Sequence, residues 1–148
     1  MRTEVELFPA RFEGDRLRYL CERQACTPGT DPDSTARALM TTRFPDVPLR
    51  RVLIHSTSWR YEHDCLTLTY LAYSDDLPFG ELRHAVPRDA KAIGAGEASV
   101  VAHAIRHLAF RTRQEPELYG RAISPETLAH LGRIDPEVAG RIYRERAA

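Results

Sequence analysis

The sequence predicts an α+β fold, in which a sheet of two hairpins with one helix between them is followed by a helical C-terminal segment. Two strand pairs with short turns lie in the first ninety residues, and the last fifty residues carry helical periodicity. Strands and helices segregated along the chain in this way are typical of the α+β class, with an antiparallel or mixed sheet. At 148 residues the chain suits one domain, 1–148, sheet-rich over 1–92 and helical over 93–148.

The first hairpin is predicted in "EVELFPARFEGDRLRYLCERQ", with its turn at Glu13-Gly14-Asp15. Gly14 suits this turn because glycine adopts a positive φ without steric cost. A loop follows, and a helix is then predicted to begin with Asp31 as its N-cap and Pro32 at its first position. The helix should end at "FPDVP", because proline resists continuing a helix.

The second hairpin is predicted over Arg51–Tyr73, with Tyr61–Asp64 as its turn. Pairing about that turn would place Trp59 opposite Leu66. The segment after this hairpin, "YSDDLPFGELRHAVPRDAKAIGAGE", has the composition of a loop.

Three helices are predicted in the last fifty residues. The first spans Ala98–Arg113, where apolar residues recur at helical spacing. The other two begin at "SPETLAHL" and "DPEVAGRIYRERA", each with a cap residue followed by Pro and Glu.

Composition excludes several partner classes. Twenty-one acidic residues balance twenty-one basic ones, so no overall field attracts nucleic acid or anionic lipid. No apolar run approaches the roughly eighteen residues of a membrane helix. Three cysteines without disulfide-framework spacing, and a start without an apolar signal core, favour a cytoplasmic location. Twenty of the basic residues are arginine, which is typical of a GC-rich genome, and we expect a bacterial protein.

A polar run interrupts the first strand of the second hairpin. Alternate residues of a strand face opposite sides, yet both sides of this strand become polar at the same point, from His55 onward. One interpretation is that the strand leaves the core and lines a cleft, where small hydroxyls, an indole ring and a guanidinium would bind an anionic, ring-bearing ligand such as a nucleotide. The predicted ligand-binding residues are His55, Ser56, Ser58, Trp59 and Arg60.

A second interpretation is purely structural. In it the strand end is twisted, its Ser and Thr side chains pair across strands, and Trp59 covers the core.

The order hairpin, helix, hairpin, C-terminal helix resembles the Nudix fold over about the first ninety residues. Pro28-Gly29 matches the Pro-Gly of the family's loop, and Arg37 and Leu39 match the Arg and Leu of its helix. The resemblance implies a retained ligand cleft, which the polar strand would line.

Departures from the Nudix pattern exclude the family's usual chemistry. Nudix hydrolases hold magnesium with helix glutamates, because this ion prefers clustered carboxylate oxygens. Here Ala38, Thr41 and Thr42 stand where those glutamates would be, and no Glu occurs between Glu22 and Glu62. We therefore expect binding without diphosphate hydrolysis, no cofactor and no metal.

Two other groups of residues give weaker hypotheses of a metal site. His103 and His107 are four residues apart on one helix face, a spacing that can hold zinc, but no third ligand is identifiable. Cys21 and Cys26 with His63 or Cys65 form a still weaker metal hypothesis.

Two other functions stay open at this point. One is dimerisation or partner docking through the helical C-terminus, by Leu128, Leu131, Val138, Ile142 and Tyr143. The other is hydrolysis at an unrecognised site of His55, His63, Asp64 and His84.

Overall fold

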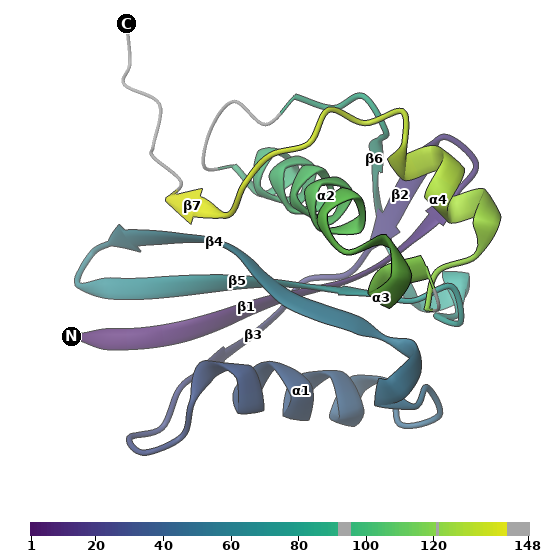
Figure 1. Ribbon diagram of the computed structural model, residues 1–148. Coiled ribbons are helices and arrows are strands. Elements are labelled where there is room, and N and C mark those ends of the chain that lie inside the picture. Colours follow the sequence, from purple (N-terminus) through teal and green to yellow (C-terminus); the bar gives the residue numbers. More distant parts are fainter. Residues whose placement is uncertain (92–95, 121, 142–148) are drawn as a thin grey trace, which may run out of the picture.

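A seven-stranded mixed sheet with helices on both faces forms the protein, as a computed structural model shows (Figure 1). The structure describes residues 1–91, 96–120 and 122–141. The strands are β1 (Arg2–Glu13), β2 (Arg16–Tyr19), β3 (Glu22–Ala25), β4 (Leu53–Glu62), β5 (Cys65–Tyr73), β6 (His84–Pro87) and β7 (Gly140–Arg141). The helices are α1 (Pro32–Arg43), α2 (Glu97–Gln114), α3 (Pro116–Gly120) and α4 (Pro125–Leu131), with 3₁₀ turns η1 (Leu49–Arg51) and η2 (Phe79–Glu81). The predicted α+β class is confirmed.

The strand order is β6-β2-β1-β5-β4-β7, with β3 beside the first half of β1. β1 runs parallel to β5, and β4 and β5 form an antiparallel hairpin. In Figure 1, α1 covers one face of this sheet, and α2, α3 and α4 lie over the other. The helical layer is thus built from the C-terminal part of the chain.

The first hairpin has the predicted turn, and Gly14 adopts a φ of +60° there. Its second strand is divided into β2 and β3, although both keep one register against β1: Ala10 faces Tyr19, and Leu7 faces Glu22. The interruption lies opposite Pro9, which has no N–H to donate to the ladder.

The predicted register of the second hairpin is wrong. Its turn residues are His63 and Asp64, both with positive φ, so Trp59 faces Leu68 and not Leu66. Two residues of positive φ give the turn whose twist matches the flanking strands, which explains the shift along the chain. A bulge at Thr57 then shifts the pairing again, so that Ser56 faces Tyr70 and Ser58 faces Thr69.

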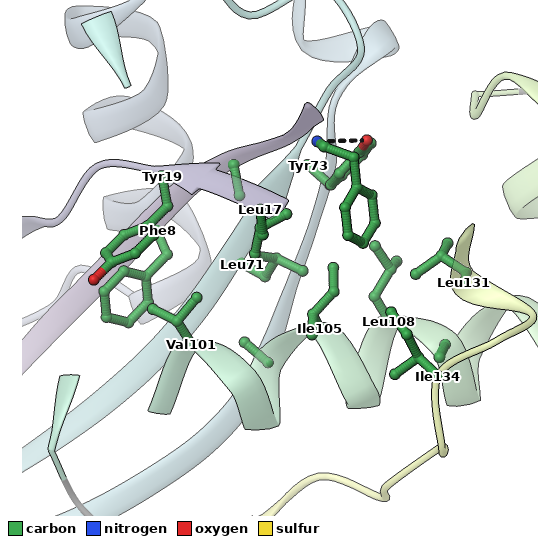
Figure 2. Close-up of a cluster of buried hydrophobic side chains, with 14 of the residues drawn as sticks. Phe8, Leu17, Tyr19, Leu71, Tyr73, Val101, Ile105, Leu108, Leu131 and Ile134 are labelled. Carbon is green, nitrogen blue, oxygen red and sulfur yellow. Dashed lines mark hydrogen bonds between the residues drawn. The ribbon is translucent and has the colours of Figure 1, made fainter. Parts of the chain in front are cut away.

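Two apolar cores lie on opposite faces of the sheet. Figure 2 shows the core under α2, where Val101, Ile105 and Leu108 point toward Phe8 and Leu71 on the central strands. The second core lies between the sheet and α1, and its buried members include Leu7, Met40, Phe44, Val52, Ala72, Leu77 and Leu82. Because the central strands are covered on both faces, only the ends and edges of the sheet offer exposed surface.

Three of the four predicted helices are present. Asp31 caps α1 by accepting a hydrogen bond from the Ser34 amide at 2.9 Å, and Ser124 caps α4 by accepting one from the Thr127 amide at 3.2 Å. The long helix spans Glu97–Gln114, one residue beyond the prediction at each end.

The helix predicted from Asp135 is wrong within the described residues. The amide of Glu137 donates to the Arg106 carbonyl instead of beginning a helical turn, and Gly140 joins the sheet beside Ser58 as β7. The segment predicted as a loop after the second hairpin also contains one strand, β6, which pairs with β2.

Among the helices of the described residues, none is long and apolar enough to cross a membrane.

Candidate functional site

Two of the three hydroxyl residues of β4 lie inside the protein, and the third, Ser56, is exposed. Thr57 and Ser58 are buried, and the Thr57 hydroxyl donates to the Thr69 carbonyl at 3.4 Å. Ser58 pairs with Gly140 of β7, and its own hydroxyl is buried without a hydrogen-bond partner among the described residues. Small side chains here let the strand bulge and accept β7 as a neighbour. Thr57 and Ser58 are 0% and 4% exposed, so their side chains present almost no surface to a ligand.

Arg60 is held by a buried carboxylate. Its guanidinium donates to both Glu6 oxygens at 2.9 Å, and Arg23 reaches one of them at 2.6 Å. Glu6 is 1% exposed and also accepts a hydrogen bond from the Thr69 hydroxyl at 3.0 Å. Burial alone would raise the pKa of Glu6, but Arg60 and Arg23 together outweigh it and hold this pKa below its ordinary value. The expected role of Arg60 as a ligand's anion clamp therefore conflicts with its place in the structure.

Trp59 points to the sheet face opposite Arg60, as strand alternation requires. Its side chain is 40% exposed, and the Arg141 guanidinium lies 5.2 Å from its ring centre. Trp59 and Arg60 thus do not converge on one opening, and Ser56, which is exposed, lies on the far side of the bulge from Ser58.

His55 faces α2 and pairs with His107, their Nδ1 atoms lying 3.2 Å apart. Burial, followed by the positive charges of His107 and Arg111, lowers the pKa of His55 to about 3. Burial, followed by His103 and Arg111, lowers the pKa of His107 to about 4. When both imidazoles are neutral, one can donate a hydrogen bond that the other accepts, and this bond joins β4 to α2. The Nε2 atom of His55 is buried and has no partner among the described residues.

The predicted zinc pair is divided between two networks. His103 donates from Nε2 to the Thr57 carbonyl at 3.1 Å, and its Nδ1 lies 2.6 Å from Glu137, whereas His107 meets His55. Within residues 1–91, 96–120 and 122–141, no group of three His, Cys, Asp or Glu side chains is placed to hold a metal ion. All three cysteines are free thiols, and burial raises the pKa of Cys21 to about 11.

The residues of the predicted hydrolase site are not brought together. His63 and Asp64 form the hairpin tip, His55 lies under α2, and His84 is on β6 at the other end of the sheet order.

Of the residues predicted for docking, Leu131 is buried in the protein's own core and Leu128 packs against it. Val138 is 64% exposed, and Ile142 and Tyr143 lie outside the described residues.

A basic pocket of about 440 Å³ lies at the sheet edge, beside the start of β4. Arg37 of α1, Arg50 and Arg51 of η1, Tyr119 of α3 and the edge residues 52–54 line it, together with Ala122. α1 supplies one wall and the segment around α3 supplies the opposite one.

The positive charge of this pocket is only partly neutralised. Arg51 forms an ion pair with Asp76. The side chains of Arg37 and Arg50 have no ion-pair or hydrogen-bond partner among the described residues. A second hollow, near α4, is lined instead by Glu13, Asp75 and Glu126 with Arg11 and His130, a set that disfavours anions. The sheet-edge pocket is therefore the better candidate for a site that binds negative charge.

The sequence contains one signal for this pocket: the pair Arg50-Arg51 stands directly before a strand, in the segment after the proline-rich helix end. In the sequence, Arg37 is marked only by its match to the Nudix helix, and no signal marks Tyr119. No protein-family model matches this sequence, and neither does any curated protein.

Proposed function

We propose that this protein binds an anionic ligand, bearing phosphate or carboxylate groups, in the pocket at the sheet edge. The observation that carries this proposal is the set of three arginines around one hollow, two of which lack a partner in the described structure. Arginine presents several N–H donors in a fixed plane, so it suits bidentate recognition of both groups. In this site the anion-binding groups are Arg37 and Arg50, and not Arg60.

We also propose that the fold is Nudix-like and binds without hydrolysing a diphosphate. What supports the absence of hydrolysis is the carboxylate content of α1, in which Asp33 is the only acidic residue. The Tyr70 hydroxyl donates a hydrogen bond to Asp33, so this carboxylate already has a partner. One occupied carboxylate cannot supply the clustered oxygens that a magnesium-dependent helix site needs.

The walls of the pocket favour a ligand with some apolar surface beside its charge. Tyr119 is held in place by Arg111, whose Nε donates to the tyrosine hydroxyl at 2.8 Å. Leu53 and Ile54 add aliphatic contact along the strand. Nucleotides, which combine phosphates with a ring, are accordingly suitable first probes, alongside pyrophosphate and citrate.

Thermal unfolding in the presence of these probes tests the proposal. A ligand with a Kd of about 10 μM, supplied at 1 mM, stabilises the folded state by about 2.7 kcal/mol. Arg37→Gln and Arg50→Gln should each weaken binding about tenfold. The matched control is Arg16→Gln, because Arg16 is exposed on β2, which β1 and β5 separate from β4. An arginine-based site would be contradicted if a ligand raised the unfolding temperature equally in all three variants. It would also be contradicted if no anion raised the unfolding temperature of the natural protein.

A further inference from the structure

Part of the outer edge of β4 is unpaired within the described residues. β7 pairs with Ser58 and Trp59, and the His103 imidazole donates to the Thr57 carbonyl. From Leu53 to Ser56, no strand of the described residues pairs with the outer side of β4. Alternate residues of an edge strand direct their N–H and C=O groups outward, so this stretch presents a short row of backbone donors and acceptors.

The unpaired stretch borders the basic pocket. Leu53 and Ile54 line the pocket, and Arg37 and Tyr119 stand on its two sides. A chain added to this edge would lie about 4.8 Å from β4, at the normal strand spacing. Its side chains would alternate between the side of Arg37 and the side of Tyr119. The pocket therefore combines the two elements of peptide recognition by strand addition, a free edge and flanking side-chain sites.

Charge decides which chain can occupy this edge. Natural sheets often protect an edge strand with charged side chains, which repel a second copy of the same edge. Edge-to-edge pairing of two copies of this protein would bring Arg37, Arg50 and Arg51 of both copies together. An acidic segment instead meets complementary charge, which favours association with it and disfavours self-pairing.

The chain itself shows that β4 accepts a strand on this side. β7 adds in parallel at Ser58 and Trp59, with Arg141 over the indole ring. It covers only the end of β4 distant from the basic pocket.

We propose that the anionic ligand is an extended acidic segment of a partner polypeptide, which adds to the Leu53–Ser56 edge of β4 and places its carboxylates beside Arg37 and Arg50. This inference rests on the anion-binding function proposed above and names its ligand class. Backbone hydrogen bonds supply the pairing, and the arginines select for acidic side chains.

Fluorescence polarisation with a labelled nine-residue peptide of alternating Glu and Val tests this. Two comparison peptides separate the contributions: one has Lys in place of Glu, and the other keeps Glu but carries N-methyl groups on four consecutive central residues. The N-methyl peptide retains its charge but loses the backbone N–H donors of those four residues, which point to both sides of an extended chain. Pyrophosphate serves as the small-anion probe, and Arg16→Gln as the control protein variant.

The Glu/Val peptide should bind at least tenfold more tightly than either comparison peptide. Arg37→Gln and Arg50→Gln should each weaken it about tenfold, and Arg16→Gln should not. Equal binding of the N-methyl peptide would overturn strand addition. Binding of pyrophosphate without binding of the Glu/Val peptide would overturn this inference and leave the anion site standing. Absence of binding by both would overturn both proposals.

Discussion

Truncation of Arg60 to alanine should destabilise the protein severely, because it removes the main partner of a buried charge. Glu6 is 1% exposed, and both of its oxygens accept hydrogen bonds from Arg60 at 2.9 Å. Breaking a buried ion pair by removing one member costs about 3–5 kcal/mol. Arg23 still reaches Glu6 at 2.6 Å, so we expect the lower end of that range, about 3 kcal/mol.

The pH dependence of this loss gives a second readout. In the natural protein the pKa of Glu6 is lowered, so the pair stabilises the fold above the ordinary carboxyl pKa and loses this effect as pH falls. Without Arg60, burial is opposed only by Arg23 and the Thr69 hydroxyl, and we expect the pKa of Glu6 to rise above its ordinary value. The variant then gains a proton on folding, so its deficit in unfolding free energy should narrow as pH falls from 7 to 5.

Urea unfolding followed by circular dichroism at both pH values measures these quantities. Arg16→Ala is the matched control, because Arg16 is exposed and a surface change of this kind alters stability by about 0.5 kcal/mol or less. The double variant Glu6→Leu/Arg60→Met should be more stable than Arg60→Ala, since no unpaired charge remains buried. A loss below about 1 kcal/mol in Arg60→Ala, or a deficit that widens toward pH 5, would refute the reasoning.

Three further outcomes follow from the structure. The pKa of about 3 for His55 lies below that of an unfolded histidine, so stability falls as pH drops below about 6.5; by pH 5 the loss from His55 is about 2 kcal/mol. Urea titrations should show a shallower fall in His55→Phe than in the natural protein, and an unchanged fall in the surface control Arg16→Gln. Ser124→Ala should cost about 1 kcal/mol through loss of the α4 cap, and an unchanged midpoint would argue against that cap. Tyr73→Phe leaves the buried amide of Phe12 without its acceptor at 3.1 Å and should lower unfolding free energy by about 1–3 kcal/mol; a neutral result would contradict the bond.

Local signals predicted most of the helices. Asp31-Pro32 and Ser124-Pro125 each place a capping oxygen before a residue that fits the first helical turn, and both helices begin there. The start at Asp135 has the same pattern and fails, because contacts distant in sequence decide it. The amide of Glu137 bonds to the Arg106 carbonyl, and Gly140 pairs with Ser58.

The register of the second hairpin shows the same limit. Hydrophobic alternation predicted two strands and a turn, but the turn is fixed by which two residues take positive φ. These are His63 and Asp64, and the bulge at Thr57 then shifts the pairing further. Neither position carries a glycine that would have marked it in the sequence.

In the sequence, the loss of apolar residues from both faces of β4 at one point favours the lining of a cleft. The partners of this polar run come from distant segments: Glu6 for Arg60, His107 for His55, and Gly140 beside Ser58. Strand alternation alone cannot predict a buried carboxylate two strands away. The basic pocket could not be predicted for a related reason. Its arginines belong to α1 and η1, which come together only at the edge of the folded sheet.

Backbone amide chemical shifts during a titration with the Glu/Val peptide test the central claim most directly. The largest changes should fall on residues 52–56, with slower amide exchange along Leu53–Ser56 when the peptide is bound. Changes centred on Trp59 and Arg60, or spread without focus over the surface, would contradict recognition at the arginine-lined edge of β4.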